Sequence, residues 1–269
     1  MRRAFRSEWW KFRRRPVLAA GLAMSFFAVL FVPLGIISAT SGSGGNGFGP
    51  QAFTLAVLNS DKGLTTLLSR GSALATVIAL VIVASSTALE YTHGTLRTLL
   101  VRQPDRFRFL TGKFAALVSY VVCAATLAFV LAVAAALITA PHRGVSTAAW
   151  TSGPGLENLV AIYGDLVFAL VTFATLGYLS AIVFRATAPA VAVPVAHLLI
   201  VENLIGAVWS GSSQWLFGRF VSGVLNGESV LKAGADVASF SHGLVGAAVY
   251  GVVFLAVSAA LFRYRDVTA

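Results

Sequence analysis

Residues 90–113 read EYTHGTLRTLLVRQPDRFRFLTGK and lie between two long apolar runs, Leu67–Leu89 and Phe114–Ala140. The segment opens with the carboxylate of Glu90 and breaks at Gly94. Leucines at helical spacing follow, then a proline and several basic residues. A plain polar turn would be enough to join two membrane helices. This basic amphipathic segment is instead suited to docking onto something in the cytoplasm.

The composition predicts an α-helical integral membrane protein. Of the 269 residues, 57% are hydrophobic and 11% are charged, whereas a soluble domain has about 25% charged residues. Apolar runs of roughly 20 residues recur, and each is long enough to cross about 30 Å of hydrocarbon. A transmembrane barrel would show short segments of alternating hydrophobicity instead.

The apolar runs predict six transmembrane helices in a single membrane domain over residues 1–269. In the fifth, Pro189 and Pro194 fall in the first turns, where proline is tolerated near a helix start and within membrane helices. The expected spans are 17–38, 66–89, 113–140, 160–184, 189–208 and 243–262.

The distribution of Lys and Arg predicts the orientation. With the N-terminus inside, fifteen of these residues lie on the cytoplasmic side and five, Arg219 among them, on the outer side. Basic residues favour the cytoplasmic side of a membrane. We therefore expect a multi-pass protein of the cell membrane with both termini in the cytoplasm.

Residues 1–16 form a basic amphipathic stretch and do not resemble a cleavable signal peptide. At helical spacing its aromatic side chains share one face, which suits a helix lying in the headgroup plane with arginines reaching anionic lipid. A basic flank that only sets the topology is the alternative. The candidate interface residues are Phe5, Trp9, Phe12, Arg13 and Arg14.

Residues 209–242 are too apolar for a solvated loop, and glycines interrupt them too often for a full span. Short interfacial or re-entrant helices fit such a pattern if their backbone is buried against protein. Trp209, Trp215 and Phe217 are the expected anchors of these helices, which would cap a pathway on the outer face.

The sequence lacks the usual signs of an enzyme. No two of the four histidines have metal-ligand spacing, and there is no Gly-rich phosphate loop, so we expect no metal, no cofactor and no ATP hydrolysis by the chain alone. The single cysteine, Cys123, excludes a disulfide within the chain. Nucleic acid is not an expected partner, because the basic residues lie at membrane edges.

Asp165, His197, Glu202 and Asn203 are the candidate polar residues within the membrane, where ionisable groups are functional candidates by default. Glu202 has an equally good structural alternative, a carboxylic acid hydrogen-bonded to a neighbouring helix, and Asp165 is expected at a membrane edge. His197 and Glu202 are five residues apart, so we expect no direct pair within one helix.

Two broader expectations concern the surfaces of the spans. The spans are so rich in Ala, Val and Leu that no pore-lining polar stripe is expected. The aromatic side chains near their ends are expected to form interfacial belts. These are Trp150, Tyr163, Tyr178 and Trp209.

The 90–113 segment resembles a known family, the type-two permeases of ABC transporters. There, the pattern Glu-x-x-x-Gly-Thr-Leu-Arg, then Pro, Arg and Gly-Lys, lies between the second and third membrane helices. The helix count, the N-terminal interface helix, the apolar 209–242 insertion and the ending FRYRD of residues 262–266 also fit.

The resemblance implies a permease subunit of an ABC exporter whose 90–113 segment is a coupling helix in a groove of a separate ATP-binding subunit. ATP and Mg²⁺ would be bound by that partner, and a second permease copy, identical or related, would complete the pathway. The alternative is a polytopic membrane enzyme or assembly factor without an ATPase partner.

From the residues alone, Arg97 or a basic residue on a partner would offset the charge of Glu90, and membrane lipid or a partner groove would cover the leucines. The docking residues implied by the resemblance are Glu90, Gly94, Thr95, Leu96, Arg97, Leu99, Leu100, Pro104 and Arg106.

Overall fold

A computed structural model describes residues 15–40, 55–94, 106–209, 211–231 and 239–264, and this part of the chain contains helices but no strands. Six helical segments are long and apolar enough to cross a membrane. They are α2 (Arg15–Thr40), α4 (Gly63–Thr92), α6 (Arg106–His142), α7 (Gly153–Phe184), the segment formed by α8 (Thr187–Ala196), η1 (His197–Val201) and α9 (Glu202–Val208), and α11 (Phe240–Tyr264). Shorter helices are α3 (Leu55–Leu58), η2 (Ser212–Gln214) and α10 (Phe217–Leu231).

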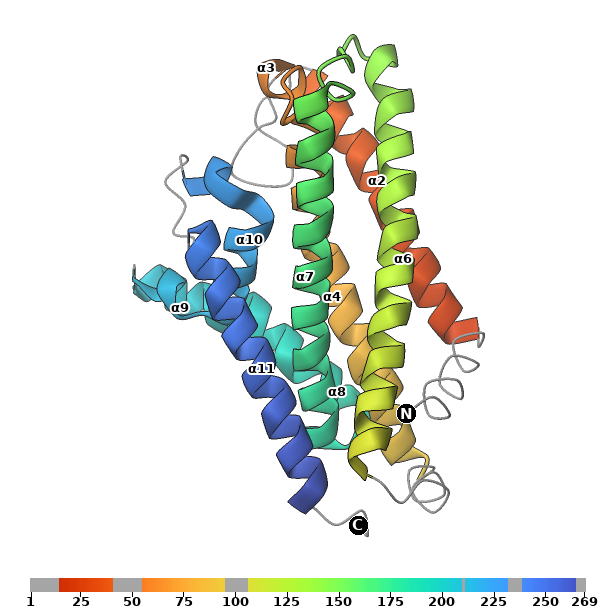
Figure 1. Ribbon diagram of the computed structural model, residues 1–269, viewed down its shortest axis with the longest axis vertical. Coiled ribbons are helices and arrows are strands. Elements are labelled where there is room, and N and C mark those ends of the chain that lie inside the picture. Colours follow the sequence, from red (N-terminus) through yellow and green to blue (C-terminus); the bar gives the residue numbers. More distant parts are fainter. Residues whose placement is uncertain (1–14, 41–54, 95–105, 210, 232–238, 265–269) are drawn as a thin grey trace.

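The helices form an elongated bundle with α4 and α7 at its centre, α2 and α6 on one side, and α8 to α11 on the other (Figure 1). The C-terminal ends of α4 and α11 lie at the same end of the bundle as the N-terminal ends of α6 and α8. We call this the α4–α6 end. Helix α3 and the connection between α6 and α7 lie at the opposite end, the α6–α7 end. All six expected spans therefore correspond to helices.

Small side chains bring α4 and α7 close together. Ala84, Ala88 and Ala181 are fully buried where these helices meet. A Cβ atom built on Gly177 of α7 would lie 2.6 Å from the backbone oxygen of Leu80 on α4. Close backbone approach at small residues is the usual means of helix association in lipid, where apolar burial alone gives little drive.

Helix α7 starts earlier than the apolar run predicted, at Gly153 rather than at residue 160. Ser152 caps its start: the backbone N–H of Gly155 donates to Ser152 Oγ at 3.3 Å, and a proline occupies the first turn. Serine at the cap and proline just inside it are standard signals of a helix start. The capping residues, not hydrophobicity, set this boundary.

The fifth membrane segment is not a regular helix. Pro194 has no N–H to donate to the carbonyl oxygen of Ala190, but the hydroxyl of Ser180 on α7 donates to that oxygen at 2.8 Å. Three residues later the chain enters the π-helical turn η1. A neighbouring hydroxyl thus satisfies the carbonyl that proline leaves open, as membrane helices require.

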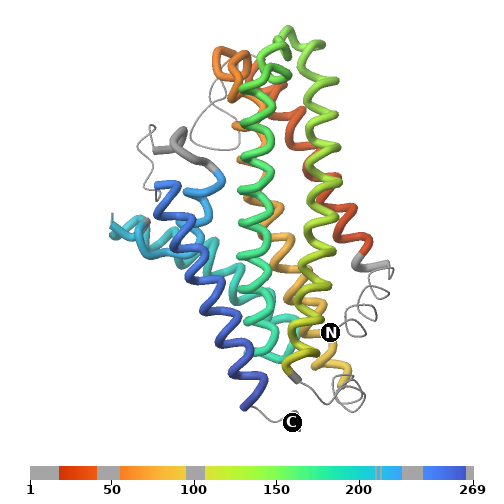
Figure 2. Tube along the Cα trace, viewed as in Figure 1, coloured from red at the N-terminus to blue at the C-terminus, as the bar shows by residue number. Residues whose placement is uncertain are grey.

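Helix α10 lies between residues 209 and 242, where short helices were expected. Its 15 residues extend about 22 Å, less than the roughly 30 Å of a hydrocarbon core. Phe217 and Phe220 are each 5% exposed and pack against the rest of the bundle, whereas Trp209 and Trp215 are exposed on the surface of the chain. Figure 2 shows α10 beside the start of α11.

Two of the expected belt residues are core residues instead. Trp150 is 1% exposed, and its indole N–H donates to the carbonyl oxygen of Leu58 at 2.7 Å. Tyr178 is also 1% exposed, and its hydroxyl donates to the carbonyl oxygen of Leu110 at 3.1 Å. Each of these side chains therefore links two distant parts of the chain within the bundle, rather than anchoring the chain in the lipid headgroups.

Candidate functional site

Glu90 and Lys113 form a buried ion pair at the α4–α6 end. Glu90 lies in the last turn of α4 and Lys113 in the second turn of α6, and their Oε2 and Nζ atoms are 2.6 Å apart. The side chains of Lys113 and Glu90 are only 2% and 10% exposed. A carboxylate is unfavourable at a helix C-terminus, and the ammonium group offsets it. Lys113 was not among the partners considered for Glu90 from the sequence, and Arg97, which was, lies outside the described residues.

The beginning of α6 is fixed to its neighbours around this pair. Phe114 packs on Tyr178 of α7 with ring centroids 5.2 Å apart, and Phe109 stacks on Phe262 of α11 at 6.5 Å. These contacts and the ion pair hold the start of α6 against α4, α7 and α11.

Most of the expected docking residues lie outside the described residues. Gly94 is described; its φ of +64° is a left-handed conformation that suits glycine, and a Cβ built there would have no neighbour within 4 Å. Arg106 begins α6. Those outside the described part are Thr95, Leu96, Arg97, Leu99, Leu100 and Pro104, together with the interface residues Phe5, Trp9, Phe12, Arg13 and Arg14.

His197 and Glu202 do face each other, contrary to the expectation from their spacing. In the π-helical turn η1 the backbone N–H of Glu202 bonds to the carbonyl oxygen of His197, so residues five apart align. His197 Nε2 lies 3.8 Å from Glu202 Oε1. The α-helical spacing rule failed here because the local helix is not an α-helix.

Glu202 also binds the start of α10. The backbone N–H of Gly218 donates to Glu202 Oε1 at 3.0 Å, and the Glu202 side chain is 4% exposed. A carboxylate at the first turn of a helix meets free N–H groups and the positive end of the helix dipole. Glu202 thus joins the fifth membrane segment to α10. This agrees with the structural alternative from the sequence, in which Glu202 bonds to a neighbouring helix, and the group that it bonds is a backbone N–H.

A cavity of about 220 Å³, the Glu202 cavity, opens beside this carboxylate between α4, the fifth membrane segment and α10. Asn203 also lines it, and the Asn203 side chain donates to the carbonyl oxygen of Leu199 at 2.8 Å. Arg219 of α10 lines it too; a Cβ built on Gly206 would lie 2.7 Å from Arg219 Nη2. Arg219 therefore lies against α9 rather than in a solvated outer loop.

A second cavity of about 440 Å³, the Asp165 cavity, lies toward the α6–α7 end between α4, α7, α10 and the start of α11. Asp165 of α7 is half-buried in its wall. Asp165 is thus placed in a cavity lined by residues of α3, α4, α7, α10 and α11, a more specific position than the expected membrane edge. Leu225 of α10 lines both cavities and lies between them.

One face of α4 lines the two cavities in turn, and this face is polar. Ala73 and Val77 are the apolar members of this face. Members recur at the i, i+3, i+4 spacing of a helix face. The expectation that no polar stripe exists was wrong, because single hydroxyl groups spaced along an apolar helix hardly change its hydropathy. The polar members are Lys62, Thr65, Thr66, Ser69 and Thr76.

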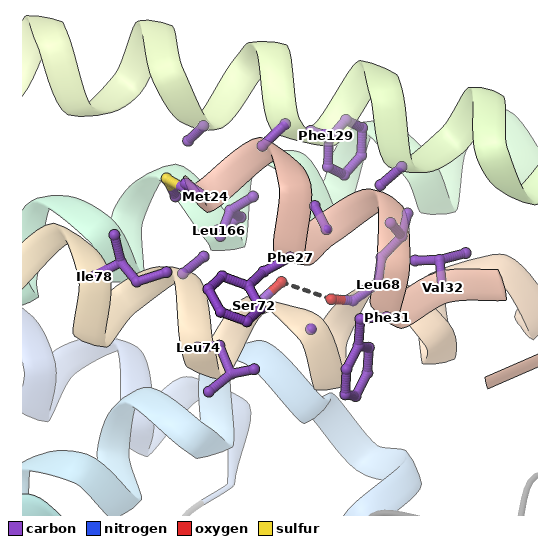
Figure 3. A pocket seen from close by; sticks show the side chains of 16 residues that line it. Met24, Phe27, Phe31, Val32, Leu68, Ser72, Leu74, Ile78, Phe129 and Leu166 are labelled. Carbon is purple, nitrogen blue, oxygen red and sulfur yellow. Dashed lines mark hydrogen bonds between the residues drawn. The ribbon is translucent and has the colours of Figure 1, made fainter. Parts of the chain in front are cut away.

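A third cavity lies between α2, α4, α6 and α7, and Figure 3 shows its lining. Its volume is about 40 Å³, and Met24, Phe27, Phe129 and Leu166 are among its walls. The hydroxyl of Ser72 turns back to the carbonyl oxygen of Leu68 at 2.7 Å and leaves the space apolar. Its size and lining are those of a packing space rather than of a polar path.

Comparison with known proteins gives the family of the chain. The model of the family described as ABC-2 family transporter protein matches residues 4–202, which include α2 to α8 and the Glu90–Lys113 pair. No curated protein matches the chain. With six apolar helices and a match over most of its length, the chain is a multi-pass membrane protein that belongs to the ABC-2 family of transporters.

Proposed function

We propose that this chain is the membrane permease of an ATP-driven exporter and that a separate ATP-binding subunit docks on residues 90–113. The observation that carries the proposal is the buried Glu90–Lys113 pair. It joins the two helices that enter and leave this segment, so a docked partner would move α4 and α6 together. We assign export from the resemblance of the 90–113 segment to exporter permeases.

The route from the docked segment to the membrane runs through α4. This helix passes from Glu90 to the polar face that lines both cavities. Rotation or tilt of α4 would change the width of both cavities together, because α4 forms one wall of each. In this account the permease contributes mechanical coupling, and the partner binds ATP and Mg²⁺ and performs the hydrolysis.

Helix α10 is the proposed cap of this route. It packs on α4, α7 and α11, and its Leu225 separates the Glu202 cavity from the Asp165 cavity. A second permease copy, identical or related, would pack against the fifth membrane segment, whose most apolar window is only 11% buried within one chain. Lipid covers the rest of the apolar surface.

Co-purification tests the proposal. The permease, carrying an affinity tag, is co-expressed with a candidate ABC ATP-binding protein of the same organism, and stoichiometry and ATP hydrolysis are measured in detergent. We expect equal numbers of the two subunits and faster hydrolysis in the complex than by the ATP-binding protein alone. Leu99→Asp should lower both the amount of bound ATP-binding subunit and the rate of hydrolysis, because it would place an unpaired charge in an apolar groove. A wild-type permease that purifies without the ATPase would contradict the proposal.

A further inference from the structure

The α4 wall of the Asp165 cavity presents oxygen atoms that are free only to accept hydrogen bonds. The hydroxyls of Thr65 and Thr66 donate to the carbonyl oxygen of Lys62 at 2.9 and 2.8 Å, and Ser69 Oγ donates to that of Thr66 at 3.0 Å. A hydroxyl has one hydrogen to donate and lone pairs that accept. Each of these hydrogens is used within the helix, so the oxygens remain as acceptors.

The facing wall continues this pattern. Asn158 and Asp165 lie seven residues apart on the cavity side of α7. The amide nitrogen of Asn158 donates one of its two hydrogens to Asp61 Oδ2 at 3.4 Å, the amide oxygen of Asn158 is an acceptor, and an ionised Asp165 only accepts. Ser60, at the α3 end of the lining, also donates its hydroxyl hydrogen to a backbone oxygen, that of Val57, at 2.7 Å. Acceptors therefore predominate on both walls.

The charges in the lining have unequal surroundings. Lys62 is exposed, so water screens its ammonium group, whereas Asp165 is half-buried between the helices. Apolar surface completes the cavity through Ile162, Val224 and Phe240. A ligand that matches this lining would bring a cationic hydrogen-bond donor to Asp165 and an apolar body to the other side chains.

We propose that the Asp165 cavity binds a ligand with a primary ammonium group on an apolar body. An ammonium group donates three hydrogen bonds, which suits one carboxylate flanked by hydroxyl oxygens. A cavity of about 440 Å³ falls in the size range of small-molecule sites and far exceeds the space of a single ion. The site does not depend on the proposed coupling to ATP, because binding needs only the permease.

Fluorescence anisotropy of monodansylcadaverine, a dansyl-labelled primary amine, tests this site on the full chain in lipid nanodiscs. We expect saturable binding, weakened about tenfold by Asp165→Asn, because a charge-assisted hydrogen bond becomes a neutral one. Thr66→Val, which removes one acceptor, should weaken binding by less. The N-acetylated probe, which has the same body without the charge, should bind weakly and equally to all variants.

Glu157→Gln is the matched control. It removes an exposed carboxylate from the same end of α7, outside the cavity lining, and should leave the affinity for the amine unchanged. The proposal fails if Asp165→Asn binds the amine as tightly as the wild type does. It also fails if Glu157→Gln weakens binding equally, or if the acetylated probe binds as well as the amine. Equal binding of the acetylated probe by all variants shows that the cavity is intact.

Discussion

Glu90 on α4 and Lys113 on α6 bring their charged atoms to 2.6 Å of each other in a nearly buried position. The two residues flank the segment that the sequence marks for docking, and the ion pair joins the helices on either side of that segment. Its location explains why a carboxylate is tolerated at the end of a helix. It also links α4 and α6, the two helices through which a docked partner would act.

Removing one member of this pair should destabilise the protein. Glu90→Gln removes the carboxylate that lies 2.6 Å from the buried ammonium group of Lys113, and breaking a buried ion pair by removing one partner typically costs about 3–5 kcal/mol. We expect a clear fall in the melting temperature, which is measured by heating samples in detergent and quantifying the remaining folded protein by size-exclusion chromatography. The double variant Glu90→Leu/Lys113→Met should recover much of the loss, because it leaves no buried charge. A Glu90→Gln variant as stable as the exposed-site control Glu157→Gln would contradict the assignment.

The contact of α4 with α7 depends on Gly177. Gly177→Ala would place a methyl group 2.6 Å from the carbonyl oxygen of Leu80, so the two helices must separate, at a cost of about 1–3 kcal/mol. Gly164→Ala on the same helix is the control, because a Cβ there meets nothing within 4 Å. We expect thermal unfolding to show Gly177→Ala destabilised and Gly164→Ala unchanged or slightly stabilised. Equal melting temperatures would mean that the helices are less close than described.

The link between Glu202 and α10 should depend on an acceptor at that position more than on charge. Glu202→Gln keeps an oxygen for the backbone N–H of Gly218, whereas Glu202→Leu leaves this partly buried N–H without its acceptor, at a cost of up to about 1–3 kcal/mol. Limited proteolysis between α10 and α11 should therefore be faster in Glu202→Leu than in Glu202→Gln. Identical cleavage rates in the two variants would show that α10 does not rely on this bond.

Sequence reasoning predicted the six membrane segments because length and hydropathy decide whether a helix crosses a membrane. It missed features that depend on single residues. The cap at Ser152 lengthens α7, and the buried partners of Trp150 and Tyr178 come from elements far away in the chain. The polar face of α4 has a signature in the sequence, the helical spacing of hydroxyl residues from Thr65 to Thr76. The mostly apolar composition of the helix drew attention away from this spacing.

Two other parts of the candidate site depend on backbone geometry that spacing cannot reveal. The π-helical turn brings His197 to Glu202, and the return of α10 brings Gly218 to the same carboxylate. The sequence singled out Glu202 as a polar group within a span, but it gave no sign of these neighbours.

The proposed cap makes a prediction about access along α10. In a Cys123→Ser background, a cysteine at Ser222 lines the Glu202 cavity and should react with a small cationic thiol reagent, as mass spectrometry would detect. Cysteines at Phe217 and Phe220, which are buried and line neither cavity, should be protected. Uniform reaction at the three positions would mean a loose segment and would remove the basis for a cap.

Reporter fusions check the orientation on which the docking proposal depends. Fusions after Gly47 and after Ser229 should report an outer location, and fusions after Gln103 and at the C-terminus a cytoplasmic one, because basic residues concentrate on that side. An outer signal after Gln103 would place the docking segment where no ATPase could reach it.

The central claim is that the Glu90–Lys113 pair transmits movement of the docked segment to α4. Its most direct test is the ATP-dependent change in thiol labelling of a cysteine at Thr66, on the α4 face, in the purified complex with its ATPase and a Cys123→Ser background. We predict that ATP changes the labelling rate in the wild type, that Lys113→Gln abolishes this change while the ATPase still binds, and that the exchanged pair Glu90→Lys/Lys113→Glu restores part of it. An ATP-dependent change of undiminished size in Lys113→Gln would contradict the claim.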